Sequence, residues 1–174
     1  MEQLKSGARI RGKFIAECYD KHGNLKWIEE AHNIITNEGL NHILDVTLHG
    51  KTLISPFYCV LSESNTTPLA THDYAVPGYT ETEAYDEETR PEYEEAAASS
   101  QSITNSANKA TFTINATKTM YGAALVGGSS TKSDTTDDSA HVLLCSALFG
   151  SSRSVVDDDV INLTYTVSAA DDGE

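Results

Sequence analysis

The stretch Arg9-Ile-Arg-Gly-Lys-Phe-Ile-Ala-Glu-Cys-Tyr19 decides the class of fold, because its polar and apolar side chains alternate. The basic side chains fall on one side of an extended chain and the apolar ones on the other: Arg9, Arg11 and Lys13 against Ile10, Phe14 and Ala16. This period of two residues is typical of a strand with one buried face. Asp20-Lys-His-Gly-Asn24 follows with the Gly and Asn of a tight turn, and Leu25–Ile35 resumes as an extended run. Residues 8–35 are therefore predicted to form a β-hairpin.

Short apolar stretches recur between turn-rich segments in the rest of the chain, and they predict further strands. These strand candidates are Ser55–Leu61, Ala107–Asn115, Thr119–Val126, His141–Phe149 and Val160–Ser168. Many short strands separated by turn signals favour two antiparallel sheets packed face to face. The predicted fold class is all-β, an antiparallel β-sandwich that is jelly-roll-like in its broad plan.

One segment breaks the strand pattern and predicts a single short helix near residues 37–49. Its large apolar residues recur at helical spacing, which places them on one face of an amphipathic helix: Leu40, Ile43, Leu44 and Leu48. Thr36 or Asn37 can cap the start of this helix, and Gly50 can close it. A glycine inside the segment, Gly39, weakens a helix by about 1 kcal/mol relative to alanine.

Length and composition bound the organisation of the chain. The 174 residues suit one domain, with no apolar run of the length that a membrane span needs. The N-terminus lacks the apolar stretch of a secretory signal, so we expect the protein to stay in the compartment where it is made. We predict a basic N-terminal arm and first strand over residues 1–26, a sandwich domain over 8–168 that overlaps the arm, and an acidic tail over 169–174.

The charge is distributed unevenly. The formal net charge is −14, which argues against direct nucleic-acid binding because phosphate contacts require clustered Lys and Arg. Residues 1–51 are neutral, and within them Lys5, Arg9, Arg11 and Lys13 occur with no acid in between, whereas 81–95 places eight carboxylates around one arginine. Two interpretations stay open: the basic arm meets an acidic surface of another copy or protein, or these are a solvated edge strand and a solvated loop.

The residues that carry chemistry form no recognisable catalytic or metal-binding motif. Cys18, Cys59 and Cys145 are widely spaced, which suits free thiols packed as small hydrophobes. The six histidines show no metal-ligand spacing, and Asp157-Asp-Asp159 lies between two apolar runs, where a hairpin turn is expected. A nucleophile elbow and a complete phosphate loop are both missing. We therefore expect no cofactor, no metal and no enzymatic activity.

Several segments, taken in chain order, resemble a known class of protein. They are Trp27–Asp45, Ser55–Leu61, Tyr85–Tyr93, Ile103–Ile114, Met120–Val126, and Leu143–Val155 followed by the Asp-rich turn and Val160–Val167. This order is similar to that of small virion proteins of tailed bacteriophages, which are capsid decoration (cement) proteins or tail and neck proteins. The resemblance covers most of residues 27–168 and rests on turn and core residues.

The resemblance implies a structural virion protein on the capsid exterior, assembled in the host cytoplasm. Its partners would be the major capsid protein and copies of itself, as a trimer or dimer, with no nucleic acid or membrane. The alternative is a tail or neck component, or a receptor-binding fibre protein in which Trp27, Tyr79 and Tyr121 stack on bacterial glycan.

Two protein interfaces are expected within this hypothesis. The first is the basic arm, through Lys5, Arg9, Arg11 and Lys13; the second lies in the acidic segment, through Tyr85, Arg90 and Tyr93. Arg and Tyr are enriched at the centres of interfaces, and carboxylates belong at their rims. Deleting residues 1–13 is expected to abolish capsid binding and to leave the sandwich folded.

Overall fold

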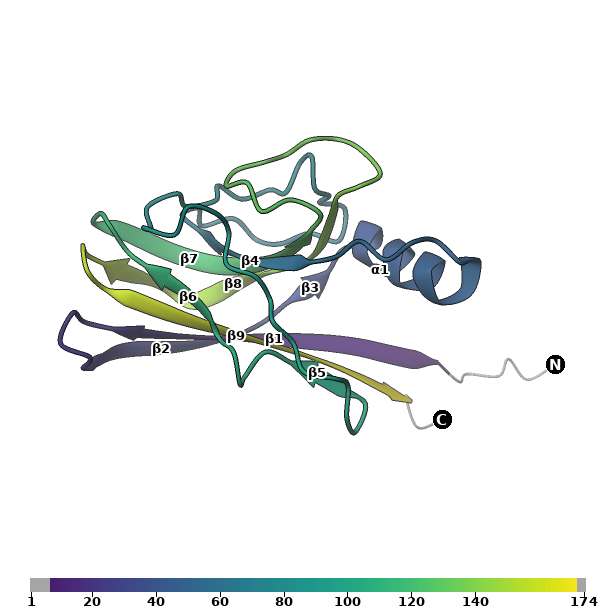
Figure 1. Cartoon of the computed structure of the whole chain (residues 1–174), viewed down its shortest axis with the longest axis horizontal. Helices are drawn as coiled ribbons and strands as arrows, with labels where there is room; N and C mark the ends of the chain where they lie inside the picture. Colours follow the sequence, from purple (N-terminus) through teal and green to yellow (C-terminus); the bar gives the residue numbers. More distant parts are fainter. Residues whose placement is uncertain (1–6, 172–174) are drawn as a thin grey trace.

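Two antiparallel sheets pack face to face and enclose the core of the protein (Figure 1). The computed structural model describes residues 7–171. The first sheet has the order β2-β1-β9-β5, with β6 also paired to β9, and the second has the order β3-β8-β7-β4. The predicted all-β antiparallel sandwich with one short helix is therefore confirmed.

The elements follow the chain in the order expected for a sandwich whose connections cross repeatedly between two sheets. The strands are β1 (Ala8–Tyr19), β2 (Leu25–His32), β3 (Ile34–Ile35), β4 (Phe57–Ser62), β5 (Ser102–Thr104), β6 (Ala110–Thr113), β7 (Lys118–Gly127), β8 (Val142–Val155) and β9 (Val160–Asp171). The helical segment is α1 (Asn37–Leu44), which continues as a π-helical turn, η1 (Asp45–His49).

The predicted hairpin over residues 8–35 is confirmed in β1 and β2, which pair antiparallel. Its turn is closed by Asp20, whose carboxylate accepts hydrogen bonds from the backbone N–H of His22 and Asn24 at 2.8 and 2.9 Å. Gly23 has a φ of 81° there, a left-handed conformation that glycine adopts without strain. The extended run after the turn is broken at Asn33, because β3 leaves the first sheet and pairs with β8 in the second.

The first and last strands lie side by side inside the first sheet. β1 pairs with β9 along its whole length, from Ala8 opposite Asp171 to Tyr19 opposite Val160. Deleting residues 1–13 would remove half of a central strand, so the expectation that this deletion leaves the sandwich folded is wrong. β9 also includes residues 169–171 of the expected acidic tail, and residues 172–174 lie outside the described part of the chain.

The core lies between the two sheets and is filled by side chains that the alternating pattern directs inward. Its largest fully buried members are Tyr85, Tyr165, Phe14, Phe112, Leu61, Ile114, Met120, Leu125, Ile161 and Leu163. Val60 and Leu143, which are also fully buried, belong to a second, smaller cluster with Tyr74, Ala124 and Val126. Burying one such aliphatic or aromatic side chain contributes about 1.5–3 kcal/mol. The three cysteines are free and buried, as expected from their apolar surroundings.

Two segments that connect strands are held to the sandwich by specific contacts. A turn does join β8 to β9 at residues 157–159, but the expected hairpin is wrong, because the two strands lie in different sheets and the turn crosses between them. Asp159 accepts a hydrogen bond from the Val156 N–H at 2.8 Å and pairs with Lys26. The long segment between β4 and β5 covers the outer edge of β4, through bridges from Ser62 to Glu81 and from Tyr58 to Glu92. Residues 82–95 are irregular, as the proline at position 91 predicts.

Candidate protein-contact face

The basic residues of β1 lie on the outer face of the first sheet. Arg9 and Arg11 are exposed, and none of the ion pairs found within residues 7–171 includes either of them. Lys13 differs, because its Nζ pairs with Glu30 Oε2 at 3.0 Å. Lys5 lies outside the described residues. Within residues 7–171, Arg9 and Arg11 are therefore two exposed arginines without a carboxylate partner, in a chain with 26 acids and 12 bases.

The three residues expected at a second interface are buried inside the chain itself. The exposed fractions are 2% for Tyr85, 3% for Arg90 and 5% for Tyr93. Tyr85 packs edge-on against Phe112, and the Tyr93 hydroxyl donates a hydrogen bond to the Tyr165 carbonyl at 3.2 Å. Burial raises the pKa of both tyrosines above its ordinary value, so both phenols stay neutral. These side chains have no free surface for another subunit, and the expected contact through them is corrected.

Arg90 is the centre of a buried polar cluster that holds three loops together. Its guanidinium pairs with Glu81 at 2.6 Å and donates to the Tyr74 hydroxyl at 2.8 Å. It also donates to the carbonyls of Ser129 and Asp134, each at 3.1 Å. The residue that stood out among carboxylates in the sequence therefore fixes the loop between β7 and β8 against the rest of the domain.

The apolar face of α1 and η1 points away from the sheets. Thr36 caps the helix, since its hydroxyl accepts a hydrogen bond from the Gly39 N–H at 2.9 Å, and Gly50 closes η1 in a left-handed conformation. The helix buries Gly39 and His42, whereas Leu44 is 55% and Leu48 is 80% exposed. The amphipathic pattern was thus present, but the apolar stripe is on the solvent side.

Gly39 explains this orientation. A Cβ atom at this position would lie 2.4 Å from the backbone oxygen of Leu144 in β8. Only glycine permits so close an approach between helix and strand, so α1 is seated on β8 by its glycine side. On the other side of the helical segment, Leu44 and Leu48 are more than half exposed.

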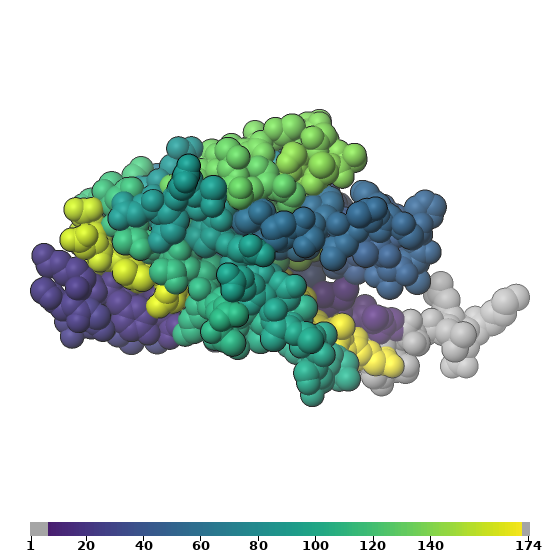
Figure 2. All heavy atoms as spheres, viewed as in Figure 1, coloured from purple at the N-terminus to yellow at the C-terminus, as the bar shows by residue number. Residues whose placement is uncertain are grey.

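A groove lies between α1 and the N-terminal half of β1, and it is lined by both Leu40 of the helix and Arg11 of the strand. It has a volume of about 550 Å³ and lies where β1, β3 and α1 meet. Its lining residues are Ile10, Arg11, Gly12, His32, Asn33, Ile34, Ile35 and Leu40. Figure 2 shows the blue helical segment beside the purple start of β1 at the same end of the molecule.

We define the contact face as the half-buried Ile10 and the exposed apolar and basic residues at this end of the sandwich: Arg9, Arg11, Ile34, Leu40, Leu44 and Leu48. Four of these are among the exposed large apolar side chains, and two are the arginines that have no ion-pair partner within residues 7–171. Contiguous exposed apolar surface rimmed by polar residues marks sites of protein contact. The arrangement can bury apolar area and attract an acidic partner.

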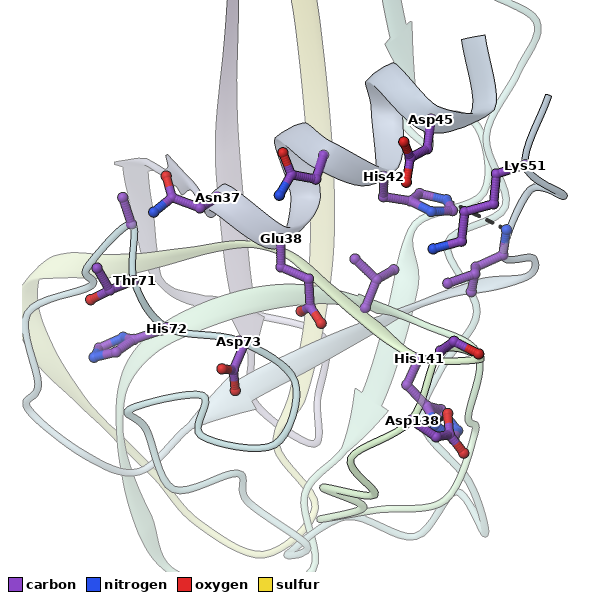
Figure 3. A pocket seen from close by; sticks show the side chains of 15 residues that line it. Asn37, Glu38, His42, Asp45, Lys51, Thr71, His72, Asp73, Asp138 and His141 are labelled. Carbon is purple, nitrogen blue, oxygen red and sulfur yellow. Dashed lines mark hydrogen bonds and ion pairs between the residues drawn. The ribbon is translucent and has the colours of Figure 1, made fainter. Parts of the chain in front are cut away.

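A second depression lies on the other side of α1, between the helix and two loops (Figure 3). Its volume is about 470 Å³, and its polar lining includes Glu38, His42, His72, Asp73 and His141. Glu38 points from the helix toward the loops (Figure 3), where its Oε2 accepts hydrogen bonds from the N–H groups of Tyr74 and Leu143 at 3.0 and 2.7 Å. Burial raises the pKa of Glu38 above its ordinary value.

The polar groups of this depression mostly hold their own loops. His72 Nδ1 accepts a hydrogen bond from the Leu69 N–H at 3.3 Å, and Asp73 Oδ1 accepts one from the Val76 N–H at 2.7 Å. His141 Nδ1 lies 2.7 Å from Asp138 Oδ1. Within residues 7–171, no group of three or more His, Cys, Asp or Glu side chains is placed to hold a metal ion.

The fold and the contact face define an all-β sandwich with an apolar, partly basic end suited to protein contact. No family model matches the chain, and no curated protein matches it either. Among the described residues, no helix is both long and apolar enough to cross a membrane.

Sequence reasoning found the arginines of the contact face and missed its apolar part. The leucines of the helix were recognised by their spacing, but spacing alone does not say which side of a helix meets the sheet. The available signal was Gly39, because a glycine within a helix often marks a close backbone approach. Ile34 gave no signal, since the bend at Asn33 interrupts a run that resembles one continuous strand.

Proposed function

We propose that this protein is a structural component of a tailed-bacteriophage virion that stabilises the capsid shell as a decoration protein, by binding the shell through the contact face. The observation that supports this proposal is the exposure of Leu40, Leu44 and Leu48 on a helix whose Leu40 lines the same groove as Arg11. Neither Arg9 nor Arg11 has an ion-pair partner within residues 7–171. A monomer gains nothing from exposing such side chains, whereas a subunit of an assembly buries them against its neighbour.

The remainder of the surface suits the same role. The strongly negative net charge keeps the free protein soluble and discourages non-specific association with other acidic molecules. Arg9 and Arg11 then provide a local basic site that orients an acidic partner against the apolar groove. The bacteriophage context comes from the resemblance of residues 27–168, and the shell is the partner that it implies.

The decisive experiment is to count the copies of this protein in purified virions by quantitative mass spectrometry, with separated heads and tails. Hundreds of copies confined to heads are expected for a decoration protein. A count of roughly six to twelve, as a symmetric ring at one vertex requires, would place the protein in the neck or tail. Absence from particles would overturn the virion assignment altogether.

A matched pair of variants tests the contact face itself. Leu48→Asp is expected to weaken binding to purified heads at least tenfold, because Leu48 is 80% exposed and its loss removes apolar contact area. The control is Leu25→Asp, which changes another exposed leucine at the start of β2, beside the 20–24 turn, and should leave binding unchanged. Both variants should fold, and equal binding by both would overturn the assignment of this face.

A further inference from the structure

The strand that carries the two arginines has an open edge at its N-terminal half. β1 pairs with β9 from Ala8 onward, but its pairing with β2 begins only at Lys13, opposite His32. In residues 7–171, no strand pairs with Ala8–Arg11 on the side away from β9. Figure 1 shows β1 and β9 continuing past β2 towards the chain ends.

The backbone groups at this edge can be assigned from the register. The carbonyl of Gly12 faces the open side, because it accepts a hydrogen bond from the Asn33 N–H at 3.2 Å. Residues two positions apart in a strand direct their backbone to the same side, so the N–H and C=O of Ile10 and Ala8 also face it. These are the groups to which an added strand would bond.

The two faces of this edge differ in chemistry. On the inner face, Ile10 borders the groove that Ile34 and Leu40 also line. On the outer face, Arg9 and Arg11 stand two residues apart with no ion-pair partner among the described residues. Because side chains of a strand alternate between faces, a strand added here fits best with apolar residues facing the groove and carboxylates facing the arginines.

The same charges disfavour a second copy of β1 as the added strand. Antiparallel pairing of two β1 edges about Ile10 would place Arg9 of each copy opposite Arg11 of the other. Like charges directly opposite one another destabilise a strand pair. Lysine and arginine on an edge also protect it against self-association.

We infer that the open edge of β1 accepts an extended strand with alternating acidic and apolar residues, supplied by the neighbouring shell subunit. The identity of the donor rests on the proposed function; the chemistry of the strand rests on the edge, the groove and the two arginines. The bound strand would extend the first sheet by one strand and cover the groove between β1 and α1.

The test uses the full chain labelled with ¹⁵N and a hexapeptide of alternating valine and glutamate as the probe. We expect the peptide to slow hydrogen exchange at the Ile10 amide and to shift the resonances of Ile34 and Leu40. A hexapeptide of alternating valine and lysine is the charge control. A peptide with three valines followed by three glutamates is the control for alternation, and both should bind at least tenfold more weakly.

A pair of charge variants tests the arginines with the same peptide. Arg9→Glu combined with Arg11→Glu should weaken binding of the acidic probe at least tenfold. Lys21→Glu combined with Lys51→Glu changes the net charge equally at two exposed lysines outside the ion pairs, and it should change binding less than twofold. Circular dichroism of each variant verifies that the sandwich is folded.

Four results would overturn the inference. They are no protection of the Ile10 amide by the acidic peptide, equal binding of the lysine peptide, protection already present in the free protein at every concentration, and protection that grows with protein concentration. The third result would assign the edge to residues 1–6 of the same chain, and the fourth to a second copy. If the acidic peptide binds but the protein is absent from virions, the proposed function and the shell subunit as donor are both overturned. The chemistry inferred for the added strand would still hold.

Discussion

Arg90 and Glu81 form a bidentate ion pair in the interior of the protein, with Nη2 to Oε2 at 2.6 Å and Nε to Oε1 at 2.9 Å. Their side chains are 2% and 5% exposed. A charged pair so well removed from water is stable only because each member satisfies the other, together with the Tyr74 hydroxyl and two carbonyls. The pair therefore fixes the segment between β4 and β5 to the loop between β7 and β8.

Removing one member of this pair should be costly. Arg90→Ala leaves the Glu81 carboxylate buried without its partner, and breaking a buried pair in this way costs about 3–5 kcal/mol. The free energy of unfolding, measured by urea denaturation, is expected to fall by that amount. The control is Lys13→Ala, which removes a solvent-exposed pair and should cost less than about 1 kcal/mol. If the two variants lost equal free energy of unfolding, the buried pair of Arg90 would contribute no more to stability than the pair of Lys13.

The three thiols should be inert in the folded protein. Cys18, Cys59 and Cys145 are each fully buried, and burial raises the pKa of Cys18 and of Cys145 to about 12. Only the thiolate reacts rapidly with a disulfide reagent. Labelling with such a reagent is expected to modify none of the three in native buffer and all three in denaturant. Rapid labelling of any thiol in native buffer would contradict the packing of that strand.

Much of the fold could be predicted because strand periodicity is local. The alternation in residues 9–19, the Asp20 turn and the closing strand all follow from neighbouring side chains, and each is confirmed. β5 escaped prediction because it has three residues and owes its pairing to β9, which is distant in sequence. β3 escaped for a similar reason, since the bend at Asn33 depends on the second sheet.

The candidate site was predicted less well, for two physical reasons. The arginines of β1 could be found from alternation, because polar residues opposite a buried face must meet solvent. The burial of Arg90 could not be predicted, because the same sequence pattern, one arginine among carboxylates, occurs both in exposed contacts and in buried ion pairs. Only the tertiary structure shows that Glu81 and Tyr74 enclose it.

Acidification should destabilise the protein through His42. This histidine is 4% exposed, and its Nε2 accepts a hydrogen bond from the Ile54 N–H at 3.4 Å, which requires a neutral ring. Burial, with a smaller effect of Lys51, lowers the pKa of His42 from its ordinary value of 6.5. A lowered histidine pKa stabilises the fold above pH 6.5 and loses that contribution as the pH falls towards the folded-state pKa.

The measurement is the free energy of unfolding at several pH values between neutral and mildly acidic. The wild-type protein is expected to lose stability as the pH falls, and His42→Gln should lose less over the same interval. An NMR titration of His42 provides a direct check, because the midpoint of its titration should lie below pH 6.5. A ring that becomes protonated above that pH would contradict its burial beside β4.

Gly39→Ala tests the seating of the helix on which the contact face depends. In an ordinary helix this change would stabilise by about 1 kcal/mol. Here the added Cβ would lie 2.4 Å from the Leu144 oxygen and 2.9 Å from its Cα, which are backbone atoms of β8 and cannot move aside cheaply. We expect the free energy of unfolding to fall by about 1–3 kcal/mol, as overpacking does.

Asn41→Ala is the matched control, because it lies on an exposed position of the same helix and should be neutral or slightly stabilising. If Gly39→Ala stabilised the protein as much as Asn41→Ala, the helix would not be seated on β8 by its glycine side. The leucine stripe would then be free to turn towards the sheet, and the contact face would lose its apolar half. If only Gly39→Ala destabilises, the close approach of helix and strand is what keeps Leu44 and Leu48 directed outward.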